Sequence, residues 1–500
     1  MLKQMLTGAL TSKPYSFTSR PWELRTVQSI DVLDGLGSNI CIDFKETEIS
    51  RILPRKNIIN DYWISDKIRF FYDGLKRQRL NTPYTKHRKY LKTLKWKKVL
   101  AQISSILNVF SFEYGNSKLG LILGSSVDTE TYFSARNLKF GCGFYNVSLD
   151  NYSNILIDNP NMYKFQDSIK LLENTDYCLL IGTNPRLEAS ILNLKLKKIY
   201  NKGKFFLSSI GSSFVTTFKF NNISFNLISL YTLSEGKHNL CKYIVKAKNP
   251  KIIYGAKILQ RFDSIGFYNL LKVLNQNYKS VFSKNFYYNI LHSDANIVGG
   301  CNVGFESFSK DTLQKLKFVY CIGVENFNFC KYLNFEKILL VIQNWTGNRN
   351  TSLADIILPS TSFIESNSTF YNTENCPQRS HKVFFGPYLA RHNWQILNIF
   401  IYLLCKSSLY STKVELSDAL SKILPSYYYT NKWFNSGNLS INKVFDFGML
   451  SKEIVLGSNL RLIIEDFFMT QSFCYSSPTM AKASSLMRTN SFNYNFLKCI

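Results

Sequence analysis

Two apolar stretches, Leu119-Gly-Leu-Ile-Leu-Gly124 and Tyr177-Cys-Leu-Leu-Ile-Gly182, decide the fold class. Each stretch ends in glycine, and segments with helical periodicity follow at residues 128–140 and 186–200. Strands that are apolar along their whole length are covered on both faces, as in parallel sheets with helices on either side. Apolar strands that alternate with amphipathic helices therefore predict an α/β protein built in layers.

The same alternation extends over most of the chain but not over its ends. Further apolar strands are predicted at residues 204–209, 251–255, 317–323 and 337–343. Short strands separated by turns are predicted nearer the start, at residues 27–31, 39–43 and 49–53. We expect four regions: an N-terminal connector at 1–25, a small mixed β-rich domain at 26–80, a layered α/β body at 81–405 and a divergent C-terminal region at 406–500.

Length and composition indicate a multidomain globular protein. The 500 residues exceed what one ordinary hydrophobic core accommodates, so two to four domains are expected. No apolar run reaches the ~18 residues of a membrane-spanning helix. The longest candidate, residues 396–405, is interrupted by Asn398 and followed by Lys406, which predicts a buried helix.

The chain is strongly basic, with 61 Lys and Arg against 34 Asp and Glu and a formal net charge of +27. Such a charge is typical of proteins that bind nucleic acids or anionic membranes. The sequence is also rich in Asn, Ile, Phe and Tyr, whose codons, like those of Lys, are rich in A and T; drift in an A/T-rich genome therefore explains the charge equally well. The densest basic stretch, residues 86–98, leads into an amphipathic helix and is open to three interpretations: a solvated helix face, a contact with an acidic protein, or a nucleic-acid site.

Eleven cysteines are scattered along the chain without a Cys-x2-Cys pair, and five histidines are isolated. An odd count with irregular spacing predicts neither a disulfide framework nor a zinc site, and a reducing compartment fits. Most of these cysteines are expected to be small buried hydrophobic residues. Cys142, between Gly141 and Gly143, is the one candidate metal ligand by local flexibility, and the simpler interpretation is a small residue in a loop after a helix.

Two glycine-containing turns are candidate ligand sites. Gly182-Thr-Asn-Pro-Arg186 follows a buried strand, where the next helix could hold a phosphate on its first N–H groups. The competing interpretation is a simple helix entry, with Asn184 as the cap and Pro185 in the first turn. Gly120 and Gly124 do not make a dinucleotide fingerprint, because their spacing differs and no acidic partner follows. No catalytic triad or paired carboxylates can be argued from residue order alone.

Eight strings of residues carry a resemblance to a known family. They follow the family's order from about residue 8 to residue 400: Gly8-Ala-Leu-Thr-Ser-Lys-Pro-Tyr15, Ser29-Ile-Asp-Val-Leu-Asp-Gly-Leu-Gly-Ser-Asn-Ile40, Arg51-Ile-Leu-Pro-Arg55, Tyr72-Asp-Gly-Leu-Lys-Arg-Gln-Arg-Leu80, Leu180-Ile-Gly-Thr-Asn-Pro-Arg-Leu-Glu-Ala189, Asn289-Ile-Leu-His292, Ala354-Asp-Ile-Ile-Leu-Pro359 and Thr369-Phe-Tyr-Asn-Thr-Glu374. The chain resembles the large iron–sulfur subunit of respiratory complex I (NADH dehydrogenase subunit 11), and more narrowly its molybdopterin-oxidoreductase-like second part. The last hundred residues are expected to lie outside this match.

The resemblance gives a meaning to Asp31, Asp34, Ser38 and Ser65. Their spacing of x2, x3 and x26 is that of four cysteines at the head of molybdopterin oxidoreductases such as formate dehydrogenase. Iron–sulfur clusters are held by thiolates, for which carboxylates and hydroxyls are no substitute. We therefore expect vestigial cluster positions, and no cofactor, metal ligand or catalytic residue on this chain. Lys67, which the resemblance places between cluster and pterin, is expected on the surface or in a salt bridge.

The resemblance also implies a partner. In the family, the Gly-Ala-Leu string follows the last cysteine of a cluster-binding domain, and Met5 occupies that cysteine's position here. The expectation is a split gene, with the iron–sulfur half made as a separate polypeptide. Residues 10–23 are the expected contact with it, because in an unsplit relative they are joined to the cluster domain.

What the resemblance implies about function is a non-catalytic structural subunit of the peripheral NADH-oxidising arm of complex I. Iron–sulfur clusters and FMN would reside on partner subunits, with no nucleic-acid partner and no direct membrane span. The expected location is the matrix side of the mitochondrial inner membrane, with synthesis inside the organelle. Two other classes stay open: an active molybdopterin-dependent oxidoreductase with unusual ligands, and a basic nucleic-acid-binding protein.

Overall fold

The computed structural model describes residues 12–496 apart from 88–89, 151–154, 156, 159, 204, 262, 283–286, 309, 326–337, 407–409, 429–458, 461–463 and 465. Several predictions concern residues outside this description. They are the position of Met5, residues 10–11 of the expected contact, residues 88–89 of the basic stretch, and most of residues 429–458 in the C-terminal region.

The N-terminal domain is a three-stranded antiparallel sheet of β1 (Arg25–Ile30), β2 (Asn39–Lys45) and β3 (Glu48–Pro54). Helix α1 (Asp66–Phe70) and the 3-10 helix η3 (Phe71–Lys76) follow it. Ile40, Ile42 and Ile52 point into a core that also takes Trp345, Phe363 and Phe473 from distant segments. The three predicted strands are confirmed, but the small domain completes its core with residues from far along the chain.

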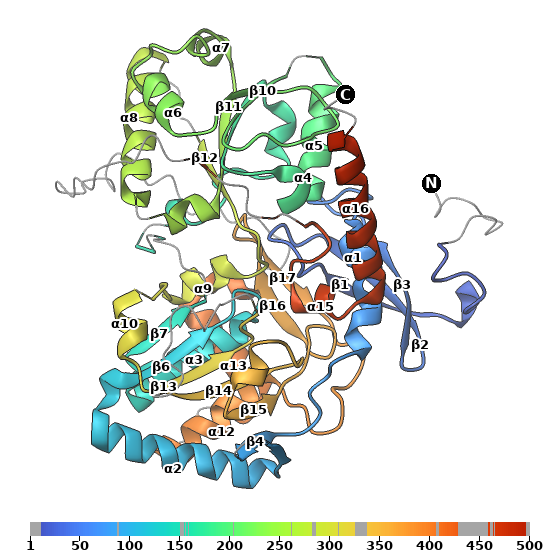
Figure 1. Cartoon of the computed structure of the whole chain (residues 1–500), viewed down its shortest axis with the longest axis vertical. Helices are drawn as coiled ribbons and strands as arrows, with labels where there is room; N and C mark the ends of the chain where they lie inside the picture. The colour runs from blue at the N-terminus through green and yellow to red at the C-terminus, as the bar shows by residue number, and fades with distance from the viewer. Residues whose placement is uncertain are drawn as a thin grey trace.

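A seven-stranded sheet forms the lower half of the molecule in Figure 1. Its order is β5 (Tyr90–Thr93), β4 (Tyr84–His87), β15 (Ile356–Pro359), β14 (Leu339–Asn344), β13 (Phe318–Ile322), β6 (Leu119–Leu123) and β7 (Asn146–Leu149). The five strands from β15 to β7 are parallel, while β4 and β5 form an antiparallel hairpin at the edge. This sheet confirms the predicted α/β class.

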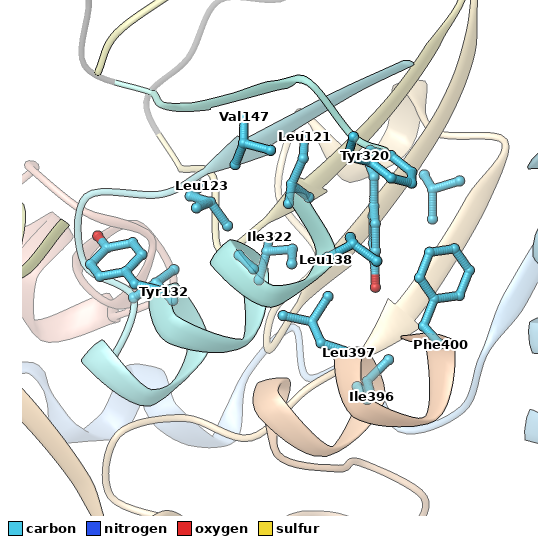
Figure 2. Close-up of a cluster of buried hydrophobic side chains, with 14 of the residues drawn as sticks. Leu121, Leu123, Tyr132, Leu138, Val147, Tyr320, Ile322, Ile396, Leu397 and Phe400 are labelled. Atoms are coloured by element: carbon cyan, nitrogen blue, oxygen red, sulfur yellow. The ribbon is translucent and has the colours of Figure 1, made fainter. Parts of the chain in front are cut away.

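The alternation of side chains along β6 and β13 explains why these strands are apolar throughout. Leu121, Leu123, Tyr320 and Ile322 face helices α2 (Trp96–Tyr114), α3 (Thr129–Cys142) and α12 (Asn393–Cys405), as Figure 2 shows for α3 and α12. The intervening residues face the opposite side, where they pack with α10 (Lys310–Lys315) and its C-terminal end: Ile122, Val319 and Cys321 with Leu313 and Leu316. Because both faces are covered, neither set could be polar. Helix α12 also confirms the buried helix predicted at residues 396–405.

A second sheet of five parallel strands interrupts the first in the sequence. Its order is β10 (Asn221–Ser224), β9 (Phe206–Ile210), β8 (Tyr177–Ile181), β11 (Pro250–Gly255) and β12 (Tyr287–Leu291). Its helices are α4 (Pro185–Glu188), α5 (Ser190–Tyr200), α6 (Ile228–Ser234), α7 (Cys241–Lys246), α8 (Ser264–Phe282) and α9 (Ile297–Val303), the last of which returns to the first sheet. The predicted α/β body therefore contains two sheets with separate cores.

The basic stretch at residues 86–98 differs from the predicted helix face. Residues 86–87 belong to β4, residues 90–93 form the fully exposed strand β5, and α2 begins only at Trp96. Lysines on an exposed edge hairpin discourage pairing with another chain. The charge of this stretch thus has a structural role at a sheet edge.

The C-terminal region has more structure than the sequence predicts. Helix α13 (Lys413–Ile423) and η10 (Pro425–Tyr428) pack against α3, while α15 (Ser472–Tyr475) and α16 (Pro478–Phe496) pack against the N-terminal domain. Figure 1 shows α16, in red, beside the blue N-terminal elements. Ser477 and Thr479 hydrogen-bond the Asp73 carboxylate, and Ser476 Oγ donates to the Gly74 carbonyl at 3.0 Å. The absence of a clear apolar period is explained by these polar attachments. In the described part of the chain, no helix has the length and apolar character needed to cross a bilayer.

Candidate functional site

The vestigial positions gather around one buried loop, residues 31–38, which connects β1 to β2. The N–H of Asp31 donates to the Ser38 carbonyl at 2.8 Å and closes the loop at its base. Asp31, Asp34 and Ser38 are buried, and so is Ser65 at the start of α1. All four positions therefore lie in the interior, where polar side chains need partners.

Three of the four side chains hold the local backbone. Asp31 Oδ1 accepts the N–H of Leu33 at 2.8 Å, and Asp34 Oδ1 accepts the N–H of Leu36 at 3.1 Å, so each aspartate forms an Asx turn. Ser65 Oγ accepts the N–H of Ile68 at 3.3 Å and caps α1. By contrast, Asp31 Oδ2 and Ser38 Oγ are buried without a hydrogen-bond partner.

Lys67 is buried rather than on the surface, and its ammonium group reaches into the loop from α1. Its Nζ donates to the Leu33 carbonyl at 2.8 Å and to Thr470 Oγ1 at 3.2 Å, and it lies 5.6 Å from the ring centre of Phe467. The positive charge also acts on both loop carboxylates, as the pKa shifts of Asp31 and Asp34 indicate. Lys67 thus connects the helix after Ser65 to the loop that carries the other three positions.

The electrostatics of the loop favour a shared proton. Burial and then the neighbouring Asp34 raise the pKa of Asp31 well above its ordinary range, while the Leu33 N–H and Lys67 act in the opposite direction. Burial also raises the pKa of Asp34, and Lys67 and two backbone N–H groups lower it. Two carboxylates with one cation in a dry environment are difficult to ionise together.

Residues that sequence reasoning missed seat this loop. The hairpin of β16 (Ser368–Tyr371) and β17 (Pro377–Ser380) lies against it. The Thr373 N–H donates to the Gly35 carbonyl at 2.8 Å, Asn372 Nδ2 to Leu36 at 3.2 Å, and Gln378 Nε2 to Gly37 at 2.8 Å. The recognised string at residues 369–374 was the available signal, although its role as a seat for the loop was not visible in the sequence.

The segment before α15 covers the other side of the loop. Gln471 Nε2 donates to the Val32 carbonyl at 3.4 Å, Thr470 contacts Lys67, and the Phe473 ring stacks on Trp345 with centroids 4.0 Å apart. This cover comes from the region that was expected to be divergent. No periodic signal in the sequence could have placed it there, because its contacts are hydroxyl, amide and aromatic groups.

The donor set at this site does not fit an iron–sulfur cluster. The four positions supply two carboxylates and two hydroxyls, and the cluster chemistry requires thiolates. The Cys474 thiol lies close enough to Lys67 for the ammonium charge to lower its pKa, although burial raises that pKa more. Within the described residues, no group of three or more His, Cys, Asp or Glu side chains is close enough to hold a metal ion.

The turn after β8 is a helix entry. Asn184 Oδ1 accepts the N–H of Arg186 at 3.1 Å and caps α4, as predicted. The Glu188 carboxylate accepts Thr183 Oγ1 at 2.6 Å and the Asn184 N–H at 3.3 Å, so it takes the donors that a phosphate would need. Burial raises the pKa of Glu188 to about 7. The turn is therefore filled by the chain's own carboxyl group.

Carboxyl groups also occupy the crevice beyond the carboxyl ends of the strands, where α/β proteins bind ligands. Asp150 follows β7, Asp294 follows β12, and Glu325 follows β13. Burial, Asp294 and Glu325 together raise the pKa of Asp150 well above its ordinary range. An anionic pterin dinucleotide, the cofactor of the molybdopterin oxidoreductases that the chain resembles, would be repelled by these groups, so the crevice does not fit it.

A cavity of about 390 Å³ lies at the carboxyl ends of β13, β14 and β15 and reaches Val32 of the loop. Hydroxyl and amide groups predominate among its polar side chains, with Trp345, Trp394 and Phe473 as aromatic walls. Its charges are mixed: Asp128 and Glu325 face Lys382 and Lys413. Lys413 is 3.4 Å from the buried Glu130 carboxylate, so part of the positive charge is already neutralised by the protein.

Two further candidates have structural explanations. A Cβ on Gly124 would overlap the Gly323 backbone, so that glycine allows close approach of neighbouring chain segments. Cys142 is the last residue of α3 rather than a loop residue, and Gly143 ends the helix in the left-handed conformation with φ +72°. Neither position belongs to the loop or to the cavity.

Comparison with sequence families places these observations. The profile described as Molybdopterin oxidoreductase matches residues 79–401, and that described as NADH-ubiquinone oxidoreductase NDSU1/NuoG-like, 4Fe-4S domain matches residues 24–73. The class of protein is therefore the molybdopterin-oxidoreductase fold preceded by a 4Fe-4S-type domain, here with a donor set that lacks thiols.

Three relatives narrow this class. The NADH-ubiquinone oxidoreductase 75 kDa subunit of Reclinomonas americana is 34% identical over 97% of this chain and 71% of its own length. The 78 kDa mitochondrial subunit of Neurospora crassa is 33% identical over 98% and 66%, and a bacterial NADH-quinone oxidoreductase subunit, from Rickettsia bellii, is 32% identical over 95% and 68%. The chain belongs to this family of large NADH-ubiquinone oxidoreductase subunits.

The comparisons also correct one expectation. The matches to relatives cover 95–98% of the chain, so most of the last hundred residues belong to the family match. Their contacts with the loop at residues 31–38 give a physical reason for this. Among solved structures, a formyltransferase/hydrolase complex from Methylorubrum extorquens covers 65% of this chain at 11% identity with a TM-score of 0.44, a likeness too low to support a functional comparison.

Proposed function

We propose that this chain is a non-catalytic structural subunit of the peripheral, NADH-oxidising arm of respiratory complex I. Its role is to brace that arm while electrons pass from NADH to quinone through other polypeptides. The observation that carries the proposal is the buried loop in which Asp31, Asp34 and Lys67 stand where an electron-carrying cluster would need four thiolates.

The proposal reconciles the 4Fe-4S domain match with the donor chemistry. The matched residues, 24–73, include the complete three-stranded sheet and α1. A fold of this kind can persist without its cluster if other contacts replace the metal–ligand bonds, and the two Asx turns, the Ser65 cap and Lys67 are such contacts. The iron–sulfur clusters and FMN of the complex then reside on partner subunits.

The segment before β1 supports a docking role toward a cluster-bearing polypeptide. Phe17 and Trp22 are exposed, while Arg51 lies over the buried Tyr15 ring at 4.6 Å and holds this segment on the sheet. Large aromatic side chains on a surface are typical of protein interfaces. The relatives also contain a part that this chain does not span. We assign residues 12–23 as the contact with an iron–sulfur polypeptide of the same subunit.

The proposed location is the matrix side of the mitochondrial inner membrane, as a peripheral component. The relatives from Neurospora crassa and Candida albicans are named as mitochondrial subunits. Synthesis inside the organelle is part of the same proposal and rests on the A/T-type amino-acid composition.

The test is to isolate the chain from its native complex and to measure its metal content and its electron paramagnetic resonance spectrum. The expected result is comigration with NADH-oxidising activity before dissociation, and neither stoichiometric iron nor molybdenum on the separated chain. A tetranuclear iron centre on the isolated chain would overturn the structural role. Stoichiometric molybdenum or tungsten would favour the oxidoreductase alternative, and steep salt-dependent binding to nucleic acid would favour the third class.

A further inference from the structure

Two cysteines that are far apart in the sequence lie together at the outer side of the seven-stranded sheet. Cys142 is the last residue of α3, and Cys405 is the last residue of α12. These helices pack against each other over the sheet, as Figure 2 shows. The Cys405 thiol is a hydrogen-bonding neighbour of Cys142, and its Sγ is 3.3 Å from the carbonyl oxygen of Gly141.

The two helix ends fix these thiols in position. Gly143 with φ +72° and Lys406 with φ +54° both adopt the left-handed conformation immediately after the cysteines, so each helix ends at its cysteine. The helices themselves are anchored by Leu138 of α3 and Leu397 of α12 in the shared core. The neighbouring thiols are therefore held by two packed helices rather than by a loop.

Accessibility distinguishes this pair from the other cysteines. Among the cysteines that the structure describes, Cys405 is the exposed one and Cys142 is half-buried. Five others are fully buried: Cys178, Cys301, Cys321, Cys376 and Cys474. An oxidant in solution thus reaches Cys405 first, and the thiol nearest to the product is that of Cys142.

We propose that Cys142 and Cys405 are a dithiol modification site that hydrogen peroxide converts to a disulfide. The Cys405 thiolate attacks one peroxide oxygen, the O–O bond breaks, and a sulfenic acid and water are formed after proton transfer. Cys142 sulfur then attacks the Cys405 sulfur, the S–O bond breaks, and a second water leaves. Two thiols lose two electrons in total, and one peroxide is reduced to two waters.

The environment assigns the two roles. Burial and the adjacent Cys405 thiol raise the pKa of Cys142, and the C-terminal end of a helix disfavours a thiolate. Cys142 is therefore a poor first reactant toward peroxide. As the resolving thiol it needs no encounter from solution, because α3 and α12 already hold it beside Cys405.

The disulfide would join the outer helices across a long stretch of chain. Between the two cysteines lie the five-stranded sheet and most of the seven-stranded sheet. A cross-link that closes so long a loop restricts the unfolded chain and stabilises the folded one. The modification would thus make the stability of the α/β body dependent on the redox state of its surroundings.

The experiment uses the full chain, first reduced and then treated with hydrogen peroxide while folded. Peptide mapping by mass spectrometry identifies the linked cysteines, and thermal unfolding with and without a reductant gives the shift in midpoint. The expected product is a peptide pair containing Cys142 and Cys405, with a midpoint higher by on the order of 5 °C in the oxidised chain. Cys405→Ser should abolish both results.

Two controls keep the result interpretable. Cys241→Ser changes a half-buried cysteine whose sulfur faces the Leu233 carbonyl and Tyr278 rather than a thiol, and it should leave the cross-link and the shift intact. Cys405→Ala replaces Cys405→Ser if the serine chain does not fold. The proposal is overturned if peroxide leaves Cys142 reduced in the folded chain, oxidises Cys405 only to a sulfinic acid, or joins Cys405 to a second chain.

Discussion

The loop at residues 31–38 and the β6–β13 core are both buried, but different forces hold them. In the sheet core, Leu121, Leu123 and Ile322 meet the side chains of α3 and α12, and the contacts are apolar throughout. In the loop, backbone groups meet the side chains of Asp31 and Lys67. Apolar packing is insensitive to pH, whereas a buried arrangement of charges is not.

The comparison explains what a cofactor site becomes when its metal ligands are absent. The sheet core resembles any α/β protein and follows from local pattern. The loop depends on distant partners, namely the β16–β17 hairpin and the segment before α15, which supply hydrogen bonds to its backbone. Its stability is therefore expected to respond to pH and to single polar substitutions, while that of the sheet core responds to lost volume.

The largest expected effect comes from Lys67→Met, which keeps the side-chain length and removes the cation. Removing one partner from a buried charge arrangement costs about 3–5 kcal/mol of the free energy of unfolding. The loss should be greatest near neutral pH and shrink toward about pH 4, because the raised pKa of Asp31 and Asp34 lets the carboxyl groups protonate. Urea unfolding at both pH values measures it.

Leu121→Ala in the sheet core is the matched comparison. It should cost about 3 kcal/mol at either pH, because it removes only apolar volume. Lys92→Met on the exposed strand β5 serves as a surface control and should change stability by less than about 0.5 kcal/mol. Equal pH profiles for Lys67→Met and Leu121→Ala would contradict the distinction between the two regions.

A smaller effect is expected from Gly37→Ala in the loop. Gly37 has φ +67°, and a Cβ there would overlap Oε1 of Gln378, whose amide donates to the Gly37 carbonyl. Left-handed strain and the displaced side chain together should cost about 2–3 kcal/mol. Gly203→Ala has similar strain, with φ +82°, but open space around it, so it should cost about 1 kcal/mol. Thermal unfolding of both variants gives the difference, and equal losses would show that the hairpin does not seat the loop.

The smallest effect has the opposite sign. Asp31→Asn keeps the acceptor for the Leu33 N–H and removes a carboxylate that burial and Asp34 make difficult to ionise. Because the folded-state pKa of Asp31 lies above the unfolded value, its contribution to stability is present below about pH 4 and is lost as pH rises through the folded pKa. The variant escapes this loss and should be more stable than the wild type by about 1–2 kcal/mol near neutral pH, with the gain vanishing below about pH 4.

Asp43→Asn is the control for that prediction. Asp43 is also buried, but its carboxylate accepts Arg51 Nε at 2.8 Å and Thr26 Oγ1 at 2.7 Å, so removing its charge should destabilise the chain. Denaturant titrations of both variants over a series of pH values provide the measurement. A destabilised Asp31→Asn chain at neutral pH would show that the Asp31 carboxylate is ionised and paired more favourably than its surroundings indicate.

The sequence was informative where one kind of contact dominates. The runs that became β6 and β8 are apolar because both faces are covered, and their glycines end the strands at close approaches of the chain. The Asn184 cap was likewise local, since a cap needs only its own helix. The basic stretch at residues 86–98 misled because lysines on an edge hairpin and on a helix face have the same composition.

The candidate site was predictable in its residues but not in its construction. The spacing of Asp31, Asp34, Ser38 and Ser65 identified the positions, and the structure places all four in the interior beside or before α1. Lys67 was expected on the surface because a charged side chain is usually exposed. Its burial depends on the carbonyl of Leu33 and on Thr470, which lies about four hundred residues further along the chain.

The amino-acid sequence by itself determined the α/β class, the small three-stranded domain and the lack of sulfur ligands at the four positions, because strand burial and donor chemistry are properties of the residues themselves. Only the tertiary structure decided that two sheets share the body, that a distant segment covers the loop, and that Cys142 meets Cys405. Those features arise from contacts between residues far apart in the chain, and such contacts leave no periodic trace in the segments that make them.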